Sequence, residues 1–139
     1  MGKELDEKVK KAFEKARKKF LFSDVDFHKA IELPEITIIS CNGKIGSLIG
    51  RNGIIVAELS KELNSKIRVV EHSNNSKKVI ADLIGNVRLL GVNEVYEPSG
   101  VKIKVIINAH DSKKLSASPE HLEKAIETLT QNKAKLEFR

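Results

Sequence analysis

Apolar residues in the first half of the chain follow helical and strand spacings in turn. A first stripe recurs mostly every three or four residues, as on one face of a helix: Leu5, Val9, Ala12, Phe13, Ala16 and Phe20. A weaker strand is predicted over 24–33 and a firmer one from Pro34 to Ile39. A second helical run, Ile55 to Leu63, precedes an alternating segment over 66–70. The expected order is helix, two strands, a helical pair and a strand.

The pattern restarts after the polar run 73–76, which we interpret as a linker. Gly85 is expected to end a short helix, Gly91 to interrupt a strand, and 98–100 to form a turn. The predicted elements are a helix over 79–84, strands over 87–95 and 101–107, a helix over 122–129 and a strand over 134–138.

The two halves resemble each other, which indicates an internal repeat. The apolar residues of three elements align at offsets of 67, 66 and 67: Ile36 and Ile38 with Ile103 and Val105, then Val56, Leu59 and Leu63 with Leu122, Ala125 and Leu129, then Ile67 and Val69 with Ala134 and Leu136. The prediction is an α+β fold with two tandem domains, 1–74 and 75–139, each a three-stranded sheet packed by helices.

A glycine-rich loop in the first copy carries the strongest functional pattern. Gly50, Arg51, Asn52 and Gly53 separate an apolar run from the following helix. Glycines let a backbone approach a bulky anion, amides at a helix N-terminus favour phosphate oxygens, and Arg51 adds a cation. A P-loop or a dinucleotide-binding loop needs a different spacing. The pattern therefore predicts contact with the backbone of a single-stranded nucleic acid.

The second copy departs from the first at this loop. Residues 116–119 read Ser-Ala-Ser-Pro, without either glycine. Ser118 is expected to cap the next helix and Pro119 to begin it. Because proline has no N–H and side chains crowd the backbone here, the second module is predicted to be structural or protein-binding.

Charge adds a second candidate surface. The 139 residues hold 25 basic and 19 acidic side chains. Residues 8–19 alone hold seven bases against one acid, Glu14; the bases are Lys8, Lys10, Lys11, Lys15, Arg17, Lys18 and Lys19. Such a window fits a polyanionic partner and equally fits a solvated helix face.

Other function classes find little support. The single cysteine, Cys41, forms neither an internal disulfide nor a thiolate zinc site, and the four histidines lack ligand spacing. We predict no catalytic residue, no metal site and no cofactor, hence no enzyme. Without an apolar run that could span a bilayer or a signal or transit peptide, the expectation is a soluble cytoplasmic protein with no membrane partner.

The predicted element order and the GxxG loop resemble the prokaryotic, type II KH domain. Two such modules in one short chain resemble the archaeal-type NusA-like transcription termination or antitermination factors. The resemblance implies single-stranded RNA binding linked to transcription. The candidate RNA-binding residues are Lys44, Ile45, Leu48, Ile49, Gly50, Arg51, Asn52, Gly53, Val56, Arg68 and Val70.

Within that candidate site, the aliphatic residues are expected to form a floor for unstacked bases, and Lys44, Arg51 and Arg68 to contact phosphates or base edges. Two alternatives stay open. One is a ribosome-associated or ribosome-assembly KH protein. The other is a protein-docking module that uses the basic N-terminal helix. RNA polymerase and the ribosome are accordingly both candidate partners.

Overall fold

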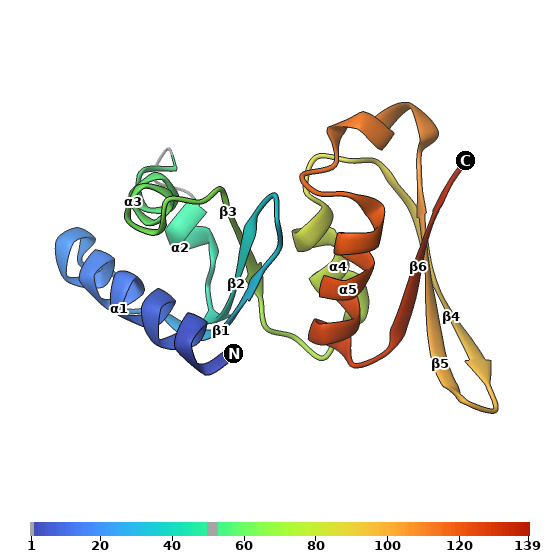
Figure 1. Ribbon diagram of the computed structural model, residues 1–139, viewed down its shortest axis with the longest axis horizontal. Coiled ribbons are helices and arrows are strands. Elements are labelled where there is room, and N and C mark those ends of the chain that lie inside the picture. The colour runs from blue at the N-terminus through green and yellow to red at the C-terminus, as the bar shows by residue number, and fades with distance from the viewer. Residues whose placement is uncertain (1, 50–52) are drawn as a thin grey trace. The chain divides into compact units, whose positions relative to one another are not determined.

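The chain folds into two compact units. The structure is a computed structural model that describes residues 2–49 and 53–139. Unit 1 comprises residues 1–72 and unit 2 residues 73–139. The division falls two residues before the boundary predicted after residue 74. Each unit is α+β, with a three-stranded mixed sheet packed by helices (Figure 1).

Unit 1 has the predicted order of elements. They are α1 (Gly2–Phe20), β1 (Val25–Glu32), β2 (Thr37–Gly43), α2 (Gly46–Ile49), α3 (Ile54–Leu63) and β3 (Ile67–Glu71). The sheet order is β1-β2-β3, with β2 antiparallel to β1 and parallel to β3. The weak strand pattern over 24–33 is confirmed as β1, although its hydrophobic alternation is broken at His28, where a bulge shifts the register.

The helices of unit 1 lie on one face of its sheet (Figure 1). Alternate strand residues such as Ile39 and Val69 point into the core between sheet and helices. Phe13 of α1 and Leu59 of α3 are fully buried there. The predicted apolar stripe of the first helix is thereby confirmed, since this burial removes most of it from water.

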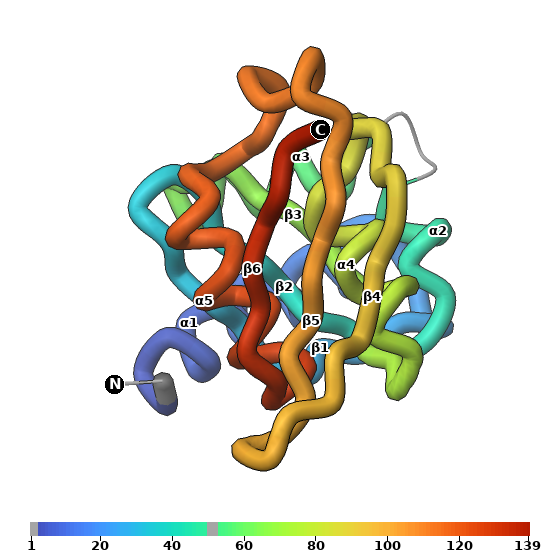
Figure 2. The backbone as a smooth tube through the Cα atoms, turned by 90° about the vertical axis from the view of Figure 1, so that its right-hand side faces the viewer, coloured from blue at the N-terminus to red at the C-terminus, as the bar shows by residue number. Residues whose placement is uncertain are grey.

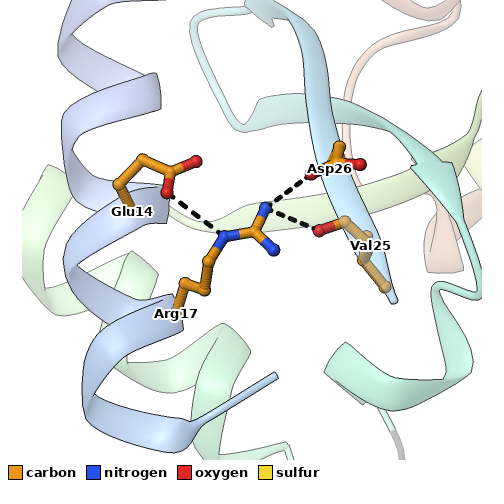
Figure 3. Close-up of polar contacts among 4 residues, drawn as sticks. All are labelled: Glu14, Arg17, Val25 and Asp26. Atoms are coloured by element: carbon orange, nitrogen blue, oxygen red, sulfur yellow. Dashed lines mark hydrogen bonds and ion pairs between the residues drawn. The ribbon is translucent and has the colours of Figure 1, made fainter. Parts of the chain in front are cut away.

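One residue of the basic N-terminal run ties α1 to the sheet (Figure 3). The Arg17 guanidinium donates to the Val25 carbonyl oxygen and to the Asp26 carboxylate, both at 2.8 Å, and to Glu14 at 3.2 Å. It also lies 5.4 Å from the ring centre of Phe13. Arg17 is therefore a structural cation, committed to the contact between α1 and β1.

Unit 2 repeats the topology with a shorter first helix, since α4 has 9 residues and α1 has 19. Its elements are α4 (Ser76–Ile84), β4 (Leu89–Glu97), β5 (Gly100–Ile107), the 3₁₀ helix η1 (Ala109–Lys114), α5 (Pro119–Thr130) and β6 (Lys133–Phe138). The sheet order is β4-β5-β6, again antiparallel and then parallel. The helices α4 and α5 lie on one face of this sheet, to its left in Figure 1 and behind it in Figure 2, and no helix of this unit covers the other face.

In each unit, the residue before the first strand is hydrogen-bonded to the turn after the second strand. We call this contact the clasp, and it recurs at a sequence offset of 64. In unit 1, the Lys44 amide donates to the Asp24 carbonyl oxygen at 3.2 Å; in unit 2, the Asn108 amide donates to the Arg88 carbonyl oxygen at 3.0 Å. A side-chain pair closes each clasp. The Ser47 hydroxyl donates to the Asp24 carboxylate, and Arg88 pairs with Asp111 at 3.1 Å. The repeat therefore extends to the contact that holds the helical turn after each central strand.

Three expectations need correction. Pro34 does not start a strand: β2 begins at Thr37 and continues to Gly43, and Pro34 lies in the bend before it. The offset of 67 places Ile38 on Val105, but Ile38 is opposite Arg68 while Val105 is opposite Leu136, a core residue. Between β2 and β5 an even offset keeps the faces matched, because side chains alternate with period two: the offset of 64 places Ile39, opposite the core residue Val69, on the buried Ile103.

The third correction concerns η1. The internal repeat implies an α-helical turn after β5, like α2 of unit 1, but the segment that follows β5 is a 3₁₀ helix. Asn108 caps it by accepting a hydrogen bond from the His110 amide at 2.9 Å. The described residues contain no helix with the length and apolar character required to cross a membrane.

Candidate nucleic-acid interface

The start of α3 is the centre of the candidate site. Gly53 precedes this helix with φ of 70° and ψ of 12°, a left-handed conformation that favours glycine, and no side chain caps the helix. The first-turn amides of a helix lack intrahelical acceptors, and the helix dipole makes this end partly positive. Gly50, Arg51 and Asn52, which the sequence assigns to this site, lie outside the described residues.

The packing beneath the loop holds α2 and α3 in place. Leu48 at the end of α2 and Ile55 in the first turn of α3 are fully buried in the core of unit 1. Gly43 makes the clasp to Asp24 possible, because a Cβ at Gly43 would lie 2.2 Å from the Asp24 carbonyl oxygen. Both the end of α2 and the start of α3 are thus anchored in the core of unit 1.

Two isoleucines beside the loop are exposed. Ile49 and Ile54 each have half of their surface accessible, which is unusual for large aliphatic residues. Ile49 was predicted; Ile54 was missed, because it lies next to the helical stripe of Ile55 and Val56 and looks like part of it. Together they place apolar surface on both sides of the uncapped helix start.

The other predicted residues form three groups: Lys44, the pair Ile45 and Val56, and the pair Arg68 and Val70. Lys44 is exposed on the connection between β2 and α2, where a cation can reach a ligand. Ile45 is buried and Val56 is half-buried against the core, so these two support the site from below. Neither supplies an open apolar floor.

Arg68 and Val70 lie on a different surface from the loop. In β3 the residues that face the helices are Ile67 and Val69, which pack in the core of unit 1. Because side chains alternate along a strand, Arg68 and Val70 point to the opposite face of the sheet. The structure therefore does not bring them together with Gly53 and α3.

The start of α5 in unit 2 has a side-chain cap, whereas the start of α3 has none. The Ser118 hydroxyl accepts a hydrogen bond from the His121 amide at 3.3 Å, and Pro119 occupies the first turn. The predicted N-cap and first helical residue are thereby confirmed. A capped helix whose first residue has no N–H offers fewer donors to an anion.

The basic face of α1 is partly neutralised within unit 1. Lys15 pairs with Glu62 at 3.2 Å and Lys19 with Glu58 at 2.9 Å, which links α1 to α3. The Lys19 hydrogen bond lowers the pKa of the Glu58 carboxyl. Among the described residues, four bases of the window have no ion pair: Lys8, Lys10, Lys11 and Lys18.

Reactive chemistry is not evident in the described part of the chain. Burial raises the pKa of the Cys41 thiol to about 12, helped by the charge of Asp26, so the thiolate is scarce at neutral pH. No three His, Cys, Asp or Glu side chains of residues 2–49 and 53–139 gather in a group that could hold a metal ion.

Comparisons with known proteins inform the fold. No family model matches the sequence. No curated protein matches it either. A solved structure described as "Crystal structure of APE1850" is similar over 96% of this chain and 97% of that chain, with a TM-score of 0.68 and 16% sequence identity. At this identity the likeness establishes a shared fold and nothing about function.

Proposed function

We propose that the protein binds single-stranded RNA through the loop between α2 and α3 of a type II KH domain. The observation that carries this proposal is the helix start at Gly53: left-handed, without a side-chain cap and flanked by two exposed isoleucines. Such a start offers amides to phosphates and apolar surface to bases. Arg51 and Asn52, which lie outside the described residues, complete the proposed contact.

The order of elements supports the KH assignment. Both units run helix, two strands, a helical turn, a helix and a strand, which is the type II order. Two such modules in tandem support a NusA-like factor in transcription termination or antitermination. In this proposal unit 1 holds the RNA, while the capped start of α5 leaves unit 2 without a second site of the same kind.

A direct binding measurement tests the RNA proposal. The full chain would be titrated into labelled single-stranded RNAs of 6 to 10 nucleotides and into the same sequences as duplexes. The proposal expects clear preference for the single strand, because a KH groove takes about four unpaired nucleotides. Equal binding to duplex, or none to either, would reject it.

The choice between transcription and ribosome biology needs a different experiment. The tagged protein would be crosslinked in cells and its bound RNA sequenced, with RNA polymerase and ribosomal proteins measured in the same eluate. Enrichment of nascent transcript ends with polymerase supports the NusA-like role. Enrichment of ribosomal RNA with ribosomal proteins supports the ribosome-assembly alternative instead.

A further inference from the structure

Four lysines lie next to one another on the face of the unit 2 sheet that its helices do not cover. On the parallel strands β5 and β6, Lys102 is the register partner of Lys133 and Lys104 of Lys135. Residues in register share a face, and the alternate residues Ile103, Val105 and Leu136 are buried in the core. The four lysines therefore project from the opposite face, which no helix of unit 2 covers (Figure 2).

This arrangement is unfavourable for the sheet alone. Strands lie about 4.8 Å apart, and like charges directly opposite each other destabilise a sheet. Within the described chain, Lys102, Lys133 and Lys135 have no ion pair, and Lys104 reaches Glu137 only at 4.0 Å. In unit 1 the matching cross-strand pairs hold at most one charge each: Ile38 with Arg68 and Ser40 with Val70.

Protection of a sheet edge explains two of the four lysines. Lysines on an edge strand discourage pairing with another chain, and β6 is an edge strand of its sheet. That accounts for Lys133 and Lys135. It does not account for Lys102 and Lys104, because β5 is the central strand and both of its edges are already paired.

The rest of this face mixes polar and apolar residues, among them the buried Ile106 two residues after Lys104 on β5, and contains few acids. Alternation places Arg139 at one end beside Glu137, with which it pairs at 3.2 Å, and Glu97 at the hairpin end. Asn93 is the register partner of Lys104, and Val95 of Lys102. No aromatic side chain shares the face, since Tyr96 and Phe138 alternate with these positions.

We propose that the lysine face, comprising Lys102, Lys104, Lys133 and Lys135, binds the phosphate backbone of RNA without reading sequence. Lysine is depleted at protein–protein interfaces, where aromatic residues, Met and Arg are enriched, so this surface does not fit a protein partner. Ammonium groups act as point charges toward phosphates, and binding releases counterions. The proposal extends the proposed function to a second surface of the chain and rests on it only for the choice of RNA as ligand.

The test compares full-length variants with equal loss of charge. The face variant is K102Q/K133Q/K135Q, and its charge-retaining counterpart is K102R/K133R/K135R. The control is K77Q/K113Q/K124Q, which removes three exposed, unpaired lysines elsewhere in unit 2. Each is made alone and together with R51D/N52D, which disables the proposed loop. Affinity for a 30-nucleotide unstructured single-stranded RNA is measured by fluorescence anisotropy between 50 and 200 mM KCl.

The face variant is expected to bind at least tenfold more weakly at 50 mM KCl, with a log–log salt slope shallower by about 2, from ~0.7 per phosphate contact. The arginine variant and the control are expected to keep the slope of the parent. The face variant should melt at or above the temperature of the parent, because like-charge repulsion is relieved. Retained stability separates lost binding from unfolding.

Three other outcomes would overturn this proposal, and a fourth would overturn the proposed function of the loop instead. Equal effects of the face and control variants would mean that general charge, not this face, binds RNA. Unchanged RNA affinity with weakened binding of a 20-residue polyglutamate peptide would assign the face to an acidic protein. Complete loss of binding in R51D/N52D, with the affinity of the parent in the face variant made alone, would reject the face and leave the loop proposal standing. An effect of the face variant alone would reject the loop instead.

Discussion

The two units begin equivalent helices in opposite ways. In unit 1, α3 starts at the left-handed Gly53 without a side-chain cap; in unit 2, α5 starts at Ser118 and Pro119 with a serine cap. A capped start stabilises the helix, typically by about 1 kcal/mol. An uncapped start leaves amides free for a ligand. Unit 1 therefore lacks a stabilising cap at the helix start where we propose the RNA contact, and unit 2 has that cap.

What surrounds these helix starts is much more alike. The clasp between the residue before the first strand and the turn after the second recurs at the same offset of 64, formed by Asp24 with Lys44 and by Arg88 with Asn108. Both units also carry similar charge, 14 bases against 11 acids and 11 against 8. Unit 1 has eight of its 14 bases on α1, whereas unit 2 has four of its 11 bases on the strands β5 and β6. A shared fold thus carries two different polar surfaces.

The largest expected effect comes from making the loop of unit 1 acidic. In R51D/N52D, affinity for short single-stranded RNA is expected to fall at least about 100-fold, because one charge-assisted contact is worth about 1.5–3 kcal/mol and the acids add repulsion. The fold is expected to be unaffected, since the sequence places both substitutions in a polar glycine-rich loop. Fluorescence anisotropy with a short RNA gives the affinity, and circular dichroism reports the fold.

The matched control places the same charge change in unit 2. S112D/K113D also removes one base and adds two acids, at two exposed positions of η1. It is expected to bind short RNA nearly as tightly as the parent. Equal losses in both variants would show that net charge dominates, and the comparison between the two helix starts would fail.

An intermediate effect is expected at the clasp of unit 2. Asp111 is buried and accepts hydrogen bonds from the Arg88 amide at 2.8 Å and the Arg88 side chain at 3.1 Å. These donors, chiefly the amide, together with Lys114, lower the pKa of Asp111 to about 2. The ordinary pKa is higher, so ionised Asp111 stabilises the fold above about pH 4, and this stability is lost as the pH falls toward 2.

The variant D111N therefore should lose stability at neutral pH and differ little from the parent near pH 2. Urea unfolding followed by circular dichroism at pH 7, 5, 4, 3 and 2 measures this convergence. D82N is the control, since Asp82 pairs with Lys78 on the surface of α4. A constant difference between D111N and the parent at every pH would contradict a role for the carboxylate charge.

The elements of this fold were largely predictable because hydrophobic period is a local signal. The stripe from Val9 to Ala16 and the alternation through Ile103 and Val105 each identify their element without tertiary information. The predicted strand start at Pro34 was wrong, because proline is compatible with both a bend and the first residue of a strand. The one-residue error at Ile38 arose because β2 is apolar on consecutive residues, which hides which face is which.

The candidate site was predictable only in part. Gly53 and the cap at Ser118 follow from backbone chemistry that single residues reveal. Arg68 and Val70 were assigned to the loop side because the face of β3 depends on its register with β2. The lysine face could not be predicted from the sequence for the same reason, because Lys102 and Lys133 become neighbours only through strand pairing.

The smallest expected effects come from exchanging single residues at the two helix starts. S118A removes the cap of α5 and is expected to cost about 1 kcal/mol. G53A places a Cβ on a left-handed residue, with open space around it, and is expected to cost roughly 1–2 kcal/mol from backbone strain alone. The stability losses should be similar, but only G53A should weaken RNA binding.

Labelling of the Cys41 thiol can show which of the two units unfolds locally. Cys41 is its one cysteine, lies in the core of unit 1, and has its pKa raised to about 12 by burial, so a thiol reagent at pH 8 reacts only when unit 1 opens. A loss of 1 kcal/mol in unit 1 speeds this labelling about fivefold. G53A should therefore accelerate labelling and S118A should leave it unchanged, although both unfold at lower urea. Faster labelling in S118A would mean that the two units open together, and the helix starts could then no longer be compared as independent sites.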